Sequence, residues 1–171
     1  MSAPVFDRAG RRLDENWRDV SDDEAIGAEA CIISFARAAR EGAALAARDA
    51  RLGVRIGPAD AIEEIAALVP RLSLIIVAFP GFRDGRGYST ARLARERYHF
   101  AGQLRAEGDV GVDQLFFMMR CGFDAFALST RAPEAALARA ARRFSQVYQS
   151  AADGRARVAV LRNDNIEGAG E

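Results

Sequence analysis

Glycines and arginines gather in the segment that follows the most apolar run of the chain, Leu72 to Phe79. After this run the chain passes Gly81, Gly85 and Gly87 and enters a helical pattern near Ser89. Backbone N–H groups at the start of a helix, together with guanidinium groups, bind small oxyanions such as sulfite, sulfate or phosphate. The candidate anion-binding side chains are Arg83, Arg86, Ser89, Arg92, Arg95 and, further along the chain, Arg105. A plain glycine turn, with Ser89 as a helix N-cap and the arginines paired with nearby carboxylates, explains the same pattern.

Two acidic residues around the next predicted strand are candidates for catalysis. Asp109 follows the strand predicted at 103–107, where it can act as a general base or orient a guanidinium group. The alternative for Asp109 is a helix N-cap. Asp113 shares a predicted helix face with Arg120, which indicates either a site residue or one half of a surface ion pair.

The chain has one histidine and two cysteines. His99 fits either a catalytic residue or a partly buried linker residue. Cys121 stands beside Arg120, and a nearby guanidinium group would favour the reactive thiolate, which makes Cys121 a candidate redox thiol. Adjacent helical residues do not face each other, so packing as a small hydrophobic residue is the alternative.

The composition excludes several classes of function. All 24 basic residues are arginine, so mechanisms that need a lysine, such as Schiff-base chemistry and the P-loop, are excluded. Cys31 and Cys121 form no paired-cysteine motif, so we predict no zinc or iron–sulfur site. The 24 acidic residues balance the basic ones, and no overall field attracts nucleic acid or a membrane surface. Lacking a signal segment and a run of about 20 apolar residues, the chain is expected in the cytoplasm.

The hydrophobic pattern predicts about five β–α units. The expected strands are 31–35, 53–57, 72–79, 103–107 and 123–128, with 157–161 as an optional last one. The expected helices are 37–51, 60–70, 89–97, about 112–119, and 133–148. Such repetition is typical of a mainly parallel α/β sheet with right-handed crossovers. The run 72–79 is apolar on both faces, which indicates a strand covered by helices on both sides.

The sheet is either open or curled into part of a TIM-like barrel, since a full barrel needs about 250 residues. Arg105 and Glu107 share one face of a predicted strand, which favours a curled sheet whose charges point at the mouth of a site. An edge strand explains these charges as well. In both forms ligands bind at the carboxyl ends of the strands. The segments that converge there are 83–89, Asp109 with Asp113 and Gln114, and Ser129 with Thr130.

Three parts of the chain differ in character. Residues 1–28 are predicted to form a small N-terminal arm, with a hairpin around Asp7 to Gly10 and with Trp17 packed on the body. Residues 29–162 form a single α/β domain, and 163–171 a disordered tail. A half-barrel leaves one side open for a second copy to cover, so a homodimer is expected.

Four uncommon sequence motifs follow one another along the chain: FPGFRDGRGYSTARL at 79–93, GQLRAEGDV at 102–110, DQLFF at 113–117 and RCGFDAF at 120–126. Through these motifs, over roughly residues 53–130, the chain resembles an uncharacterised bacterial family. Its members are commonly labelled as probable oxidoreductases involved in sulfite reduction. They tend to accompany genes for assimilatory sulfite reductase, and the label rests on this association. The arm around Trp17 is similar more weakly.

The resemblance implies a role in sulfur assimilation and marks motif positions as site candidates. These positions are Asp84, Gly85, Arg86, Ser89, Arg92, Arg105, Gly108, Asp109, Asp113, Gln114, Arg120, Cys121 and Asp124. Among them we take Asp84, Asp109 and Asp113 as candidate catalytic residues. The chain departs from similar proteins at Gln103, where glutamate is usual, and at Gly111-Val112, where Leu-Arg is usual. A catalytic role for that glutamate would leave this chain impaired.

We therefore expect an oxidoreductase or redox accessory protein of assimilatory sulfite reduction that binds sulfite or a related oxyanion. The glycines lack the spacing of a dinucleotide-binding motif, and no ligand set for an iron–sulfur cluster is present. The chain is thus not the sirohaem-bearing catalytic subunit, and no cofactor is identified. The alternative is a non-catalytic subunit or assembly factor that docks on sulfite reductase, with Phe117 and Met118 as candidate interface residues.

Overall fold

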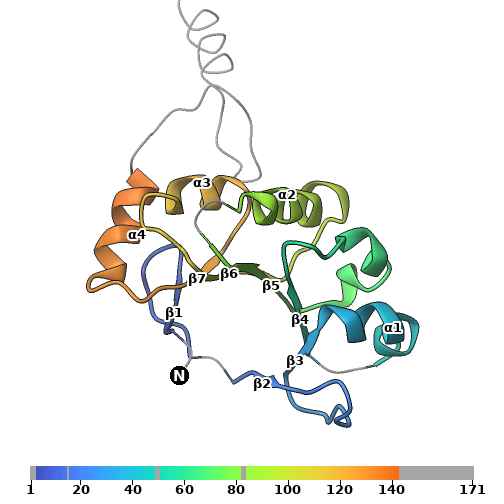
Figure 1. Cartoon of the computed structure of the whole chain (residues 1–171). Helices are drawn as coiled ribbons and strands as arrows, with labels where there is room; N and C mark the ends of the chain where they lie inside the picture. The colour runs from blue at the N-terminus through green and yellow to red at the C-terminus, as the bar shows by residue number, and fades with distance from the viewer. Residues whose placement is uncertain (1–2, 15, 49–50, 82–83, 143–171) are drawn as a thin grey trace, which may run out of the picture.

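A curled sheet forms the body of the computed structural model, which describes residues 3–14, 16–48, 51–81 and 84–142. In this part of the chain the sheet has seven strands in the order β1-β7-β6-β5-β4-β3-β2. The strands are β1 Val5–Asp7, β2 Arg18–Asp19, β3 Cys31–Ser34, β4 Leu52–Ile56, β5 Leu74–Phe79, β6 Gln103–Gly108 and β7 Ala125–Ala127. Neighbouring strands are parallel except β1 with β7. They curve around an inner side, so the sheet is a half-barrel (Figure 1).

Helices cover the outer, convex side of this half-barrel (Figure 1). They are α1 Phe35–Ala46, α2 Arg86–Arg92, α3 Leu115–Arg120 and α4 Pro133–Arg142. Two 3₁₀ turns, Ile62–Ile65 and Val69–Arg71, connect β4 to β5, and a π-helical turn, Leu93–Arg97, extends α2. The large apolar core lies between these helices and the sheet.

Strand β5 shows how the two sides of the sheet differ. Successive side chains of a strand point to opposite faces, so Ile75 and Val77 enter the core under the helices. Leu74 and Ile76 lie on the concave side, where they form a small cluster with Ile32 and contact Trp17 of the N-terminal arm. The prediction of helices on both sides of this strand was wrong, because the arm, not a helix layer, contacts its second face.

The mainly parallel α/β sheet and its curling are confirmed, but the described sheet has seven strands instead of five β–α units. The two additional strands come from the N-terminal arm. β1 pairs with β7 and β2 pairs with β3, one at each edge of the sheet. Strand β2 consists of two exposed residues, too few to give an apolar alternation that the sequence could reveal.

The helix predicted at 60–70 was wrong, because the structure has two 3₁₀ turns there. Ile62, Ile65 and Leu68 are all buried, and their three-residue spacing matches the period of a 3₁₀ turn as well as one stripe of an α-helix. Asp60 does not cap a helix; its Oδ2 accepts a hydrogen bond from the Gly57 N–H at 2.7 Å.

The N-terminal arm crosses the open side of the half-barrel between the two edges of the sheet (Figure 1). Its hairpin was predicted correctly: Phe6 bridges Arg12, and Gly10 has a φ of 84° that favours glycine at the turn. The packing of Trp17 on the body was also predicted correctly.

Some predictions lie outside the described residues. They are the optional strand at 157–161, the tail at 163–171 and the last part of the helix predicted at 133–148. Within the described ranges, none of the helices combines the length and the apolar character that crossing a membrane requires.

Candidate functional site

A polar pocket of about 310 Å³ lies on the concave side of the sheet, under the N-terminal arm. It is lined by Ala3, Pro4, Val5, Arg12, Leu13, Asp14, Trp17, Asp19, Ile32, Arg55, Arg105 and Glu107. The register of the strands explains why two arginines meet there. Arg55 of β4 pairs with Ile76 of β5, which in turn pairs with Arg105 of β6. The two arginines therefore start about 10 Å apart at one level of the sheet, and both point to the concave side.

Arg105 is almost completely buried, with 4 % of its surface exposed. Its Nη1 donates to Glu107 Oε1 at 3.2 Å, and its Nη2 donates to Gln103 Oε1 at 3.1 Å. Burial lowers the pKa of the Arg105 guanidinium group, while the hydrogen bond and the charge of Glu107 oppose this shift. A guanidinium group stays protonated at neutral pH even after such a shift, so Arg105 supplies a fixed positive charge deep in the pocket.

Glu107 lies between the two arginines. Its Oε1 contacts Arg105, and its Oε2 lies 3.4 Å from Arg55 Nη2. Arg55 Nη2 also lies 3.2 Å from Asp19 Oδ1 on the edge strand β2. A charged chain thus runs across the concave side, and its central member is a carboxylate held by two guanidinium groups.

The arm supplies the apolar wall of the pocket. Trp17 packs on Ile32 and Ile76 of the sheet, and the guanidinium group of Arg51 lies 4.9 Å from the centre of the Trp17 ring. Leu13 packs against a second small cluster of Val5 with Ala125 and Ala127. Because it is lined by arginines on the sheet side and by an aromatic ring on the arm side, the pocket can hold a small anion next to the buried Arg105.

Residues 53–158 match the model of a family described as bacterial proteins of unknown function, DUF934. The chain belongs to this family. No curated protein and no solved structure matches the chain. The family-matched region includes Arg55, Arg105 and Glu107 of the pocket, whereas Trp17 and Asp19 precede it.

The described arginines in and after the glycine turn that follows β5, Arg86 and Arg92, are both paired with carboxylates. Arg86 donates from Nη2 to Asp84 Oδ2 at 2.7 Å, and this hydrogen bond lowers the pKa of the Asp84 carboxyl group. Arg92 contacts Glu96 at 3.1 Å on the outer face of α2. These are the carboxylate pairs of the alternative interpretation, and Arg83 lies outside the described residues.

Ser89 is not the N-cap of α2, contrary to the prediction. The helix begins three residues earlier, at Arg86, and its N-cap is Gly85, which has no side chain that could form a capping hydrogen bond. Gly87 permits this early start, because a Cβ there would lie 2.7 Å from the ring of Phe79. Ser89 is exposed on the helix instead, and it does not line the pocket that contains Arg105.

Arg95 does not contribute to a site at the carboxyl ends of the strands, although the pattern suggested it. It donates to the backbone carbonyls of Gly122 and Gly102 at 3.0 and 2.9 Å, and also to that of Phe100. Its guanidinium group forms an ion pair with Asp124 as well. Arg95 therefore fastens the loops that precede β6 and β7, at the amino ends of these strands.

The remaining candidates lie apart from the concave pocket. Asp109 is exposed after β6, and its N–H donates to the Phe79 carbonyl at 2.7 Å. Asp113 lines a groove between α3 and α4 together with Phe116 and Arg139. Cys121 is 3 % exposed in the core under the helices. Among the described residues, acidic, histidine and cysteine side chains form no group able to hold a metal ion.

The sequence analysis missed Arg55, Asp19 and Trp17 as lining residues of one pocket. One signal was present: Arg55 is the only charged residue in the predicted strand 53–57, and Arg105 is a charged residue in the middle of the predicted strand 103–107. Two such residues on parallel strands indicate a shared polar face. The strand register that aligns Arg55 with Arg105 depends on the whole sheet, and it cannot be deduced from the sequence of either strand alone.

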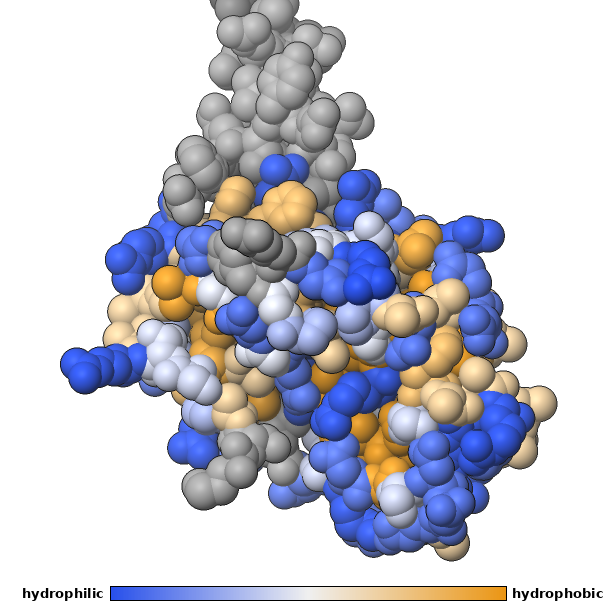
Figure 2. Space-filling model, viewed as in Figure 1, coloured by the Kyte–Doolittle hydropathy of each residue, from blue (hydrophilic) through white to orange (hydrophobic). Residues whose placement is uncertain are grey.

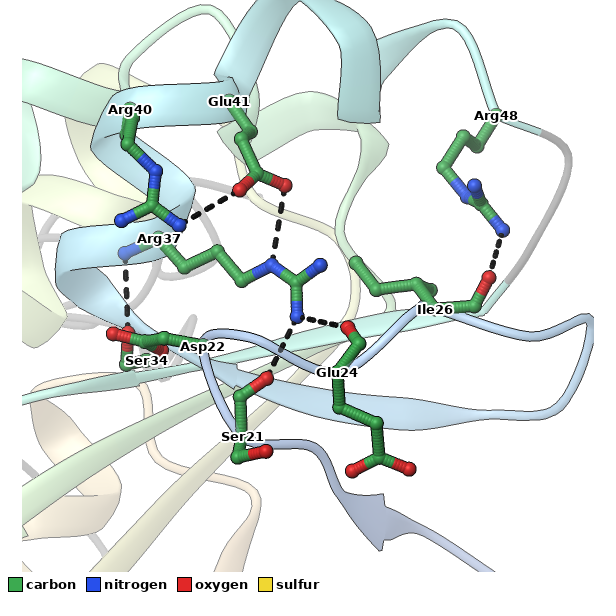
Figure 3. Close-up of polar contacts among 9 residues, drawn as sticks. All are labelled: Ser21, Asp22, Glu24, Ile26, Ser34, Arg37, Arg40, Glu41 and Arg48. Atoms are coloured by element: carbon green, nitrogen blue, oxygen red, sulfur yellow. Dashed lines mark hydrogen bonds and ion pairs between the residues drawn. The ribbon is translucent and has the colours of Figure 1, made fainter.

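A second polar cluster, around Arg37, is structural (Figure 3). Arg37 is 7 % exposed, and its Nη1 donates to the carbonyls of Ser21 and Glu24 at 2.8 and 2.7 Å. Ser34 caps α1 by accepting from the Arg37 N–H at 3.1 Å, and its hydroxyl donates to Asp22 Oδ1 at 2.6 Å. These bonds fasten the loop between β2 and β3 to α1, and they leave the pocket on the other side of the sheet untouched.

Proposed function

We propose that this protein is an oxidoreductase or redox accessory protein of assimilatory sulfite reduction that holds a sulfur oxyanion in the concave pocket. The observation that carries the proposal is the convergence of Arg55 and Arg105 on one carboxylate, Glu107. A position that two guanidinium groups share for a carboxylate also suits sulfite or sulfate, because these anions offer several oxygens to N–H donors. The assignment to sulfite reduction rests on the resemblance of the sequence motifs at 79–126 to the family described above.

Burial supports a binding role for Arg105. An exposed arginine gains little from an anion in water, whereas a charge with 4 % exposure interacts in a medium of lower dielectric constant. The pocket volume of about 310 Å³ accommodates an inorganic oxyanion with its bridging waters, and is at the small end for organic ligands. A small anion therefore fits both the charge and the size of the pocket.

Calorimetric titration with sulfite tests the site. Arg55→Gln should weaken binding by roughly tenfold or more, as expected for a charge-assisted hydrogen bond that is lost. Arg55 is partly exposed, so this variant is expected to fold. Arg40→Gln is the matched control, because Arg40 is an exposed arginine on α1 whose partner is Glu41. Equal affinity of wild type and Arg55→Gln overturns the concave site.

Arg86→Ala locates the site in a second way. If the glycine turn after β5 binds the anion, this variant loses sulfite affinity while Arg55→Gln keeps it. The concave site requires the opposite result.

Turnover is tested separately from binding. The purified protein is inspected for a bound chromophore and assayed for sulfite-dependent oxidation of NADPH. Colourless, inactive protein that co-purifies with sulfite reductase excludes the oxidoreductase form of the proposal and leaves the accessory form.

A docking subunit of sulfite reductase is the second candidate, and exposed apolar side chains favour it. Val112 and Phe117 are 49 % and 53 % exposed. Apolar side chains are visible in the upper part of the coloured surface in Figure 2. Met118, the other candidate interface residue, is completely buried. Phe117→Ser should reduce co-purification with the reductase while sulfite affinity stays unchanged, and retained co-purification contradicts docking through this surface.

A further inference from the structure

We infer that Glu107 is a built-in competitor of the oxyanion, so that anion binding in the concave pocket is coupled to protonation of Glu107. The inference rests on the proposed function, since it concerns the same pocket. It goes beyond that proposal by naming what occupies the anion position before a ligand arrives. It also predicts how binding depends on pH.

The contacts of Glu107 carry the inference. One carboxylate oxygen lies 3.2 Å from Arg105 Nη1 and the other lies 3.4 Å from Arg55 Nη2. These are the two donors that a sulfur oxyanion would use. The carboxylate is itself an oxyanion that occupies both donors, so the ligand and Glu107 cannot both occupy this position.

Glu107 is able to yield. Its side chain is 24 % exposed, whereas Arg105 beside it is 5 % exposed at its side chain. Glu107 stands near the carboxyl end of β6, at the level of Ala78 on β5, a residue that does not hold it by any charge. Rotation of the carboxyl group away from Arg55 and Arg105 frees both guanidinium groups, while the buried Arg105 stays in place.

The charge balance explains why a proton should accompany the anion. The pocket is lined by three positively charged residues, Arg12, Arg55 and Arg105, and by three negatively charged ones, Asp14, Asp19 and Glu107. Their formal charges cancel. An added anion leaves the pocket with excess negative charge, and a displaced Glu107 carboxylate would repel it at close range. Protonation of Glu107 removes both the repulsion and the competition.

The sign of the effect follows directly. The complex binds one more proton than the free protein, so anion affinity rises as the pH falls. Full coupling to one proton gives a slope that approaches roughly tenfold in affinity per pH unit. Arg12, Arg55, Arg105, Asp14 and Asp19 are the other charged groups that face this pocket.

Sulfate is the appropriate probe, because its own charge is constant near neutral pH while that of sulfite changes. Trp17 lines the pocket and is the only tryptophan of the chain, so its fluorescence reports on binding alongside calorimetry. Titrations between about pH 5 and about pH 8 compare wild type, Glu107→Gln and the control Asp19→Asn. At the upper end of this range Glu107→Gln should bind sulfate about as tightly as the wild type does at the lower end, and it should lose the pH slope, whereas Asp19→Asn should keep the slope.

The possible results separate the two proposals. Sulfate binding that needs Arg55 but is neither tightened nor made pH-independent by Glu107→Gln overturns the coupling and leaves the anion site intact. No binding to wild type or to Glu107→Gln overturns the anion site itself. Should Glu107→Gln fail to fold, the slope of the wild type decides: affinity that is constant from about pH 5 to about pH 8 contradicts the coupling.

Discussion

A buried arginine is costly unless its charge is compensated, and Arg105 is compensated on its own strand. Its partners Gln103 and Glu107 stand two positions away on either side, so all three side chains point to the same face. This local arrangement was visible in the sequence as polar residues at the alternating positions 103, 105 and 107 of one predicted strand. That Arg55 reaches the same carboxylate from two strands away was not visible, because it depends on the register of β4, β5 and β6.

Gly108 is the residue whose replacement should most directly distort the end of β6. Its φ is 103°, and an added Cβ would lie 2.3 Å from the Phe79 carbonyl oxygen. Gly108→Ala should therefore lower the free energy of unfolding by at least about 1 to 3 kcal/mol, measured by urea denaturation.

Gly42→Ala is the matched control for Gly108→Ala. Gly42 lies within α1, and outside its chain neighbours and the backbone of its own helix no described atom lies within 4 Å of a Cβ built there. Alanine should stabilise the helix by roughly 0.5 to 1 kcal/mol. Equal effects of the two substitutions would contradict the strain assigned to Gly108.

The ion pair at the glycine turn gives a prediction about pH. The side-chain hydrogen bond from Arg86 lowers the pKa of Asp84 below its ordinary value of 3.8. The pair therefore stabilises the fold above this ordinary pKa, and its contribution is lost as the pH falls through the lower folded value. NMR titration of the Asp84 carboxyl group should show a return toward 3.8 in Arg86→Ala, and an unchanged midpoint contradicts the pairing.

At the scale of elements, regular strands were predictable and their flanking segments were not. Five of the seven described strands coincide with predicted ones, since the buried apolar residues of these strands leave a recognisable pattern. The start of α2 was missed because it depends on Gly87 packing against Phe79 and not on a capping side chain. The buried 3₁₀ turns between β4 and β5 were missed because their apolar stripe also fits an α-helix.

Helix α1 and the preceding loop should behave as one unit through Arg37. Arg37→Met removes the donor to the carbonyls of Ser21 and Glu24 but keeps much of the apolar stem (Figure 3). We expect a loss of roughly 2 kcal/mol in the free energy of unfolding and faster amide hydrogen exchange in residues 21–26.

Arg40→Gln serves as the control for Arg37→Met. Arg40 stands on the same helix, and its side chain is 56 % exposed. Its exposed pair with Glu41 should contribute less than about 1 kcal/mol, with no change in exchange of the loop. Similar exchange in both variants would show that Arg37 does not fasten the loop.

At the scale of the whole molecule, the N-terminal arm covers the open side of the half-barrel. A bare half-barrel suggested a second copy as its cover, whereas the structure has the N-terminal arm across the open side (Figure 1). The homodimer stays a prediction that light scattering checks. The arm was recognised as a hairpin from local turn signals, but its place on the sheet depends on contacts between residues more than 100 positions apart, such as Val5 with Ala127. No local pattern encodes such a pairing.

Deletion of residues 1–17 tests the arm as a structural cover, because it removes both β1 and Trp17. The deletion removes β1 and thereby exposes the backbone edge of β7, and it also uncovers the apolar residues Ile32, Leu74 and Ile76 on the concave side. An open strand edge and an apolar face both promote association. The shortened chain should therefore form larger species than the full-length protein in light scattering and should bind the dye ANS.

Substitution of two arm residues separates the strand edge from the apolar face. Val5→Ser with Leu13→Ser weakens the apolar contacts of the arm but keeps the backbone pairing of β1 with β7. This variant should bind ANS without forming the larger species, because the edge of β7 stays covered. Association of both variants to the same extent assigns the effect to the apolar face. A shortened chain that behaves as the full-length protein contradicts the role of the arm altogether.

The deletion should also abolish the sulfate-dependent change in calorimetric heat, because the pocket around Arg55 and Arg105 loses its wall on the arm side.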